Sequence, residues 1–156
     1  MDDKHYLKLA VVQAKKSIDE GGFPAGAVVV KDGKIIAEGI SLGFSLHDPT
    51  SHAETAAIRA ACQNLQTSNL EGATLYESLE CCNMCFSVSY WAGISRIVYA
   101  GRKTPEMVKK MYYEGKVDND VLNGSNNKKI EVVFISDFEK DSLELVKKWE
   151  DSQKTI

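Results

Sequence analysis

The chain has 156 residues, of which 44% are hydrophobic and 26% are charged, and its formal net charge is −3. This length and composition are typical of a globular protein with a buried core, and we expect one domain over residues 1–156. The negative net charge disfavours nucleic-acid binding, which needs a basic stripe on the surface. No apolar run approaches the roughly 20 residues of a membrane span.

Helical and strand-like segments alternate along the chain. Apolar residues at three- and four-residue steps predict the helices, and short valine-rich or apolar runs predict the strands. In chain order we expect a helix at 4–20, strands at 25–30 and 34–39, a helix at 52–63, a strand at 73–79, a helix at 82–92, a strand at 95–101, a helix at 105–113, a strand at 130–136 and a helix at 138–151.

Two connections predict how the strands pair. Asp32-Gly33 between the first two strands tolerates the positive φ of a tight turn, so these strands should pair antiparallel. The strand at 95–101 follows a strand–helix unit, so it should run parallel to the strand at 73–79. The polar segment 115–129 is predicted to be a mobile loop.

Three residues of a metal-binding type stand at the starts of two predicted helices. His52 begins one helix, and Cys82 and Cys85 lie three apart on one face of the next. One histidine and two cysteines suit zinc, and three protein ligands leave a fourth tetrahedral position open, as in a catalytic site. Four cysteines in a chain without a recognisable export signal favour a metal over disulfides, and we therefore expect a cytoplasmic protein.

Glu54 follows His52 by two residues and need not bind metal. It is well placed to carry protons between water and a substrate. The combination of H-x-E, C-x-x-C and a glutamate that is not a ligand is the signature of zinc nucleobase deaminases. A structural zinc with a fourth protein ligand is the alternative, and Cys81 or Cys62 could supply that ligand.

From about residue 21 to residue 101, the chain resembles the cytidine deaminase-like zinc deaminases. Asp-Pro-Thr-Ser-His-Ala-Glu at 48–54, Thr-Leu-Tyr-Glu-Ser-Leu-Glu at 74–80 and the Cys82–Cys85 pair carry the resemblance. It implies a three-layer α/β/α fold with a mixed five-stranded sheet and helices on both faces, where periodicity alone supports only an α/β class. It also implies one zinc ion per chain, held by His52, Cys82 and Cys85, and Glu54 as proton carrier.

Within this family, Ser-Tyr-Trp-Ala-Gly at 89–93 is most similar to bacterial guanine deaminases. We therefore expect hydrolytic release of ammonia from a small nucleobase or nucleoside, with guanine first and cytosine second. Segment 47–54 resembles transfer-RNA adenosine deaminases equally well, so that activity is the alternative, although it would need a basic groove. A catalytically idle, zinc-stabilised binding protein is the alternative from another class.

The resemblance also implies the substrate contacts. They are Ser41, Phe23, Pro24, Ala53, Trp91 and Tyr113. Trp91 could equally pack under the pocket, and Glu114 is a candidate second proton carrier. Two positions depart from the family pattern: Cys81 replaces a proline, and Ser41 stands where many members have a substrate-holding asparagine.

The resemblance finally implies an assembly. These deaminases are commonly homodimers that complete each other's pockets, and guanine deaminases can exchange C-terminal segments between subunits. The polar segment 115–129 could act as the hinge of such an exchange. We expect no membrane partner.

Overall fold

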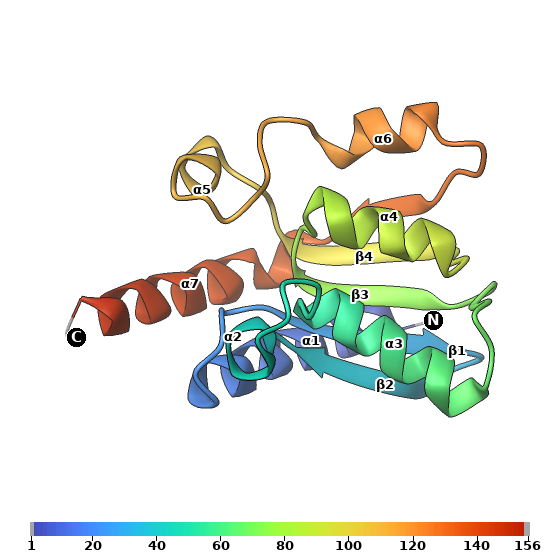
Figure 1. Ribbon diagram of the computed structural model, residues 1–156, viewed down its shortest axis with the longest axis horizontal. Helices are drawn as coiled ribbons and strands as arrows, with labels where there is room; N and C mark the ends of the chain where they lie inside the picture. The colour runs from blue at the N-terminus through green and yellow to red at the C-terminus, as the bar shows by residue number, and fades with distance from the viewer. Residues whose placement is uncertain (1, 155–156) are drawn as a thin grey trace.

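A mixed sheet of five strands forms the middle layer of this computed structural model, which describes residues 2–154 (Figure 1). Its strands are β1 (Gly26–Lys31), β2 (Lys34–Ile40), β3 (Thr74–Leu79), β4 (Arg96–Gly101) and β5 (Glu131–Phe134), in the spatial order β2-β1-β3-β4-β5. β1 pairs antiparallel with β2 and β3, whereas β3, β4 and β5 run parallel. The predicted mixed sheet and the predicted pairings are confirmed.

Helices cover both faces of this sheet (Figure 1). α1 (Asp3–Asp19) and α7 (Glu139–Gln153) contact each other on one face, and α3 (Ala53–Leu65) and α4 (Asn83–Trp91) lie on the other. The predicted three-layer α/β/α architecture is therefore confirmed. Within residues 2–154, every helix falls short of the length or the apolar character that crossing a bilayer requires.

The short helices α2 (Gly43–Leu46), α5 (Pro105–Lys109) and α6 (Asn119–Ser125) connect the main elements. The prediction of a loop over 115–129 is wrong where α6 forms. Side-chain bonds to the backbone hold this helix: Asn119 Nδ2 donates to the Cys81 carbonyl, and Asn123 bonds both the N–H and the carbonyl of Ile130. Such bonds leave no trace in hydrophobic periodicity.

The tight turn before β2 forms as predicted, and a close contact between β2 and α3 fixes where α3 begins. Asp32 and Gly33 have φ values of 52° and 72°, as the predicted tight turn requires. A Cβ at Gly39 of β2 would lie 2.1 Å from the Ala53 carbonyl oxygen and 2.9 Å from the Ala57 Cβ. The first turn of α3 thus rests directly on the sheet.

Candidate active site

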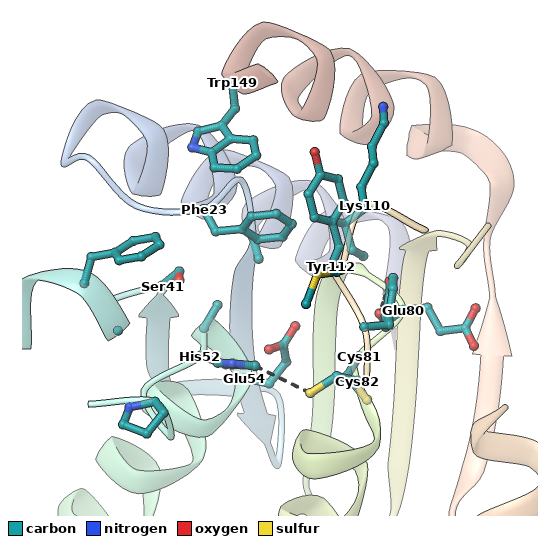
Figure 2. Close-up of a pocket in the computed structure, with 18 of the residues that line it drawn as sticks. Phe23, Ser41, His52, Glu54, Glu80, Cys81, Cys82, Lys110, Tyr112 and Trp149 are labelled. Atoms are coloured by element: carbon teal, nitrogen blue, oxygen red, sulfur yellow. Dashed lines mark hydrogen bonds between the residues drawn. The ribbon is translucent and has the colours of Figure 1, made fainter. Parts of the chain in front are cut away.

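Two helix N-termini meet at the carboxyl end of β3 and bring His52, Cys82 and Cys85 together. His52 is the N-cap residue of α3 and Cys82 is that of α4, and neither side chain caps its own helix. The Cys82 Sγ lies 3.4 Å and the Cys85 Sγ 3.6 Å from the His52 Nδ1. Figure 2 shows the first of these contacts as a dashed line.

These three donor atoms fit one zinc ion. A tetrahedral ion with a zinc–nitrogen length of about 2.0 Å and a zinc–sulfur length of about 2.3 Å separates those two ligands by about 3.5 Å. The two observed nitrogen–sulfur distances, 3.4 and 3.6 Å, bracket this value. Across residues 2–154, no other group of three histidine, cysteine or acidic side chains converges in this way.

Neither remaining cysteine joins the group. Cys81 is buried, its N–H donates to the Glu77 Oε1 at 3.0 Å, and the Asn119 Nδ2 donates to its carbonyl oxygen at 2.8 Å. Burial raises the pKa of the Cys81 thiol well above its ordinary value. Cys62 is half-buried in the later part of α3. A closed structural site with a fourth cysteine is therefore not supported by the geometry.

The surroundings of Cys82 favour its thiolate. Hydrogen bonding with Cys85 and with His52 lowers the pKa of Cys82 to about 5, against the opposing effect of burial. The partial positive charge at the start of α4 acts in the same direction. A thiolate is the form that binds metal. The hydrogen bond with Cys82 raises the pKa of Cys85 well above its ordinary value, so binding of an ion would release a proton from Cys85.

Glu54 lies in the first turn of α3 and is only 5% exposed. Burial and the nearby Cys82 raise the pKa of Glu54 to about 7. Figure 2 shows its carboxylate beside His52, directed into a cavity of about 760 Å³. A carboxyl group with a pKa near neutrality can both accept and return a proton.

Aromatic side chains form much of the wall of this cavity. The Phe23 ring lies 5.2 Å from the Tyr112 ring and 5.1 Å from the Trp149 ring, measured between centroids, and both contacts are edge-to-face. Tyr113 also lines the cavity, and its hydroxyl donates to the Glu80 carbonyl at 2.6 Å. Such walls suit a flat, partly apolar ring.

Four of the six predicted substrate contacts line the cavity. They are Ser41, Phe23, Ala53 and Tyr113. Pro24 does not, because it is fully buried beneath the entry to β1. Trp91 is 81% exposed at the far end of α4, about 9 Å of helix from Cys85 and about 13 Å from Cys82, and it lies outside the cavity lining.

Glu114 lies close to the metal ligands but outside the cavity lining. Its two carboxylate oxygens accept the N–H groups of Asn83 and Met84 at 3.1 and 3.0 Å, which caps the start of α4. Burial raises the pKa of Glu114, but hydrogen bonds from backbone N–H groups outweigh it, and the net shift is downward. A cap that stays ionised at neutral pH does not fit the predicted role of a second proton carrier.

Several lining residues were not singled out as candidates from the sequence. They are Phe44, His47, Asp48, Lys110, Met111, Tyr112 and Trp149, among others. His47 and Met111 have left-handed φ values of 51° and 65°, and Phe44 and Met111 are exposed at the rim. Trp149 lies in α7, and sequence periodicity does not say where that helix ends relative to the cavity.

Known proteins resemble this chain in sequence and in structure. Residues 1–101 match the family model of the cytidine and deoxycytidylate deaminase zinc-binding region. A guanine deaminase of Bacillus subtilis is 45% identical over 105 residues, which are 67% of each chain. A tRNA-specific adenosine deaminase of Aquifex aeolicus is 39% identical over 100 residues, which are 64% of this chain and 66% of the relative. The matched segment thus spans about two thirds of these relatives.

Solved structures extend the similarity over nearly the whole chain. A transfer-RNA deaminase, solved in a study of A-to-I editing at the wobble position, superposes with a TM-score of 0.78 at 32% identity, covering 91% of this chain and 99% of that one. The guanine deaminase of Bacillus subtilis superposes with a TM-score of 0.64 at 33% identity, covering 97% and 95%. That of Nitrosomonas europaea, at 23% identity and a TM-score of 0.81 over 94% and 83%, shares the fold.

Proposed function

The chain belongs to the cytidine and deoxycytidylate deaminase zinc-binding family, with zinc as its cofactor, and from this premise we propose that it hydrolyses the exocyclic amine of a free nucleobase. Guanine is the first substrate to test and cytosine the second. One observation carries the proposal: Glu54 is buried beside the His52, Cys82 and Cys85 donors and faces a cavity with aromatic walls.

His52, Cys82 and Cys85 would hold the ion, and zinc supplies, when bound, the acidity that makes water a nucleophile near neutral pH. Glu54 carries two protons in turn: the first from the attacking water to a ring nitrogen, and the second from the hydroxyl that has formed on the ring carbon to the departing amine. The water oxygen bonds to the ring carbon, the carbon–nitrogen bond breaks and ammonia leaves. The pKa of Glu54, about 7, suits both directions of transfer.

The cavity walls position the ring for this transfer. Phe23, Tyr112 and Trp149 offer aromatic surface above the carboxylate of Glu54 (Figure 2). Ser41 also lines the cavity, and its side chain is shorter than the asparagine of many family members. This leaves more room beside the ring, so a larger or differently substituted base belongs in the substrate panel.

Deamination of a transfer-RNA adenosine is the second candidate, because deaminases of that kind are 39% identical to this chain over 100 residues and 41% identical over 98 residues. The charge of the cavity disfavours the binding of a transfer RNA. The one lysine in the lining, Lys110, is bonded to Glu150 at 2.8 Å and to Glu106 at 3.1 Å, and the lining also holds Asp48, Glu54 and Glu80. A polyphosphate backbone would meet little free positive charge there.

We also propose that the protein is a cytoplasmic homodimer. The exposed Trp91, in edge-to-face contact with Tyr90 at the end of α4, offers an apolar surface that a second copy could cover. Light scattering at micromolar concentration tests this, and a monomer would contradict it.

The function is tested by ammonia release from the zinc-loaded protein with guanine, cytosine, adenine, their nucleosides and an anticodon stem-loop RNA. We expect activity on a free base that falls by a factor of about 10² to 10⁴ in Glu54→Gln, because the proton carrier is lost. Metal analysis should find one zinc per chain in both proteins. Activity confined to the RNA would favour the second candidate, and silence across the panel with zinc bound would favour an idle binding protein.

A further inference from the structure

The two candidate zinc cysteines are held by their backbones in different ways. Cys85 lies inside α4, where helical hydrogen bonds fix its backbone. Cys82 is the N-cap residue, and it takes part in the helix through its carbonyl, which accepts the N–H of Phe86 at 3.0 Å. The side chain of Cys82 does not cap the helix. Its direction therefore depends on the peptide bond that enters the helix, between residues 81 and 82.

Asn119 holds this peptide bond. Its Nδ2 donates to the Cys81 carbonyl oxygen at 2.8 Å, and both residues are buried. This carbonyl lies in the same peptide plane as the backbone nitrogen of Cys82, so the bond fixes the orientation of that plane. At the other end of residue 81, the N–H donates to the Glu77 Oε1 at 3.0 Å. Both backbone groups of Cys81 are thus bonded to side chains of other elements, β3 and α6.

The oxygen of the Asn119 amide holds the first turn of α4. Its Oδ1 accepts the Nδ2 of Asn83 at 3.0 Å, and the same Nδ2 donates to the Val117 carbonyl at 3.0 Å. The carbonyls of residues 81 and 117 can only accept, so they determine which end of each amide is the donor. One side chain therefore bonds both the residue before Cys82 and the residue after it.

Asn119 comes from a part of the chain that is separate from the metal motifs. It is the first residue of α6 and lies beyond residue 101, where the match to the family model ends. α6 lies beside α4 (Figure 1). The side chain of Asn119 is outside the lining of the large cavity. Its bonds to the cysteine turn are therefore not explained by contact with a substrate.

We propose that Asn119 is a positioning residue of the zinc site, which directs Cys82 toward the ion by holding the peptide bond before it. Asn119 acts through Cys81 and Asn83 and supplies no ligand atom. Residues that hold metal ligands in place typically contribute a factor of about 10–100 to metal affinity. The proposal concerns the zinc site and does not depend on the substrate.

The test is competition for zinc between the protein and a chromophoric chelator. Asn119→Asp keeps the shape of the side chain but places an oxygen against the Cys81 carbonyl, and we expect the zinc affinity to fall by a factor of about 10–100. Asn119→Ala removes both bonds without adding a charge, and its zinc affinity should fall within the same range. Wild-type affinity in both variants would overturn the proposal.

Asn123→Ala is the matched control. Asn123 lies in the same helix and also bonds backbone with both ends of its amide, because it donates to the Ile130 carbonyl at 2.8 Å and accepts the Ile130 N–H at 2.9 Å. Its loss should loosen α6 but leave the zinc affinity unchanged, since its bonds do not reach the cysteine turn. An equal loss of zinc affinity in Asn123→Ala would contradict the proposal, because the docking of α6 as a whole would then be responsible.

Cobalt substitution gives a readout that a loss of stability alone does not change. The visible absorption bands of Co²⁺ report the geometry of its ligands. At full cobalt occupancy, we expect these bands to shift in Asn119→Asp and Asn119→Ala and to keep their wild-type positions in Asn123→Ala. Wild-type bands in both Asn119 variants would show that Cys82 is directed without this side chain.

A measurement on the wild-type protein applies even if the Asn119 variants do not fold. Coupling is reciprocal, so if the docking of α6 supports zinc binding, zinc must support the docking of α6. We expect removal of zinc by a chelator to accelerate hydrogen exchange of the α6 amides more than that of the α1 amides. Equal changes in the two helices would count against the coupling. These measurements use no substrate, so their outcome is separate from that of the ammonia-release panel.

Discussion

Glu54 and Glu114 both lie near Cys82, yet their surroundings shift their pKa values in opposite directions. Burial and the Cys82 thiolate raise the pKa of Glu54 to about 7, whereas backbone N–H groups hold the pKa of Glu114 low in spite of partial burial. Only the first can exchange a proton at neutral pH. The second stabilises the turn that carries Cys82 and Cys85.

Replacing Glu114 by glutamine should therefore reduce stability without changing the chemistry. One amide oxygen cannot serve two N–H donors at the same strength, so we expect the free energy of unfolding to fall by about 0.5–2 kcal/mol. Because the pKa of Glu114 is lowered, its contribution is complete above its ordinary value of about 4.3 and fades as the pH falls through the folded value. Urea unfolding at several pH values measures this.

The pH profile of ammonia release distinguishes a role of Glu114 as helix cap from a role as proton carrier. We expect Glu114→Gln to keep the wild-type profile, and Glu106→Gln, at an exposed glutamate of α5, to change neither the profile nor the capping contribution to stability. A loss of activity of 10²-fold or more at full zinc content would instead identify Glu114 as a proton carrier.

Cys81 explains locally why proline is absent from the position before the first zinc cysteine. Proline has no N–H, and here the N–H of residue 81 is the partner of the buried Glu77 Oε1. We expect Cys81→Pro to reduce the free energy of unfolding by about 1–3 kcal/mol, because a buried acceptor loses its donor. Cys81→Ala retains the N–H and should lie within about 1 kcal/mol of the wild type. Equal stability of the two variants would show that the bond contributes little.

At the scale of elements, the start of α3 is set by its contact with β2. A methyl group at Gly39 would collide with the backbone of Ala53 and Ala57, and Ala53 lies between the candidate ligand His52 and the proposed proton carrier Glu54. Gly39→Ala should therefore push the helix away from the sheet, reduce the free energy of unfolding by about 1–3 kcal/mol and weaken zinc binding. Thermal unfolding and competition with a zinc chelator measure the two effects.

Gly124→Ala is the matched control for Gly39→Ala. Gly124 lies in α6, and a Cβ there meets nothing within 4 Å. Alanine should be neutral or stabilising by up to about 1 kcal/mol, because it favours the helix. If Gly39→Ala behaved like Gly124→Ala, the start of α3 would not depend on the close contact.

The elements that sequence predicts best are those with a strong local pattern. The apolar spacing of α1, the Asp32-Gly33 turn and the valine-rich β1 each contain their own signal, as does the offset of His52 and Glu54. α2 and α6 were missed, since four residues form no period and the Asn119 and Asn123 side chains bond to distant backbone. The metal ligands belong to short motifs that can be recognised locally, whereas the cavity walls are formed by residues far apart in the sequence.

At the scale of the molecule, the cavity is assembled from segments far apart in sequence. Phe23 follows α1, Tyr112 follows α5 and Trp149 lies in α7, and the three rings contact one another. The Tyr112 hydroxyl and the Lys110 Nζ both bond the Glu150 carboxylate, which ties the segment after α5 to the C-terminal helix. Substrate binding should therefore change the surroundings of residues in α7, although α7 lies outside the part of the chain that carries the metal motifs.

The two tryptophans of the chain allow a direct test of this coupling. Trp149 lines the cavity, whereas Trp91 is 81% exposed and lies outside it. We expect a purine analogue to change the tryptophan fluorescence of the zinc-loaded Trp91→Phe protein, because the remaining indole is part of the wall. Trp149→Phe should show no such change at the same analogue concentration. A response that follows Trp91 instead would place the bound ring at the end of α4 and would remove α7 from the substrate site.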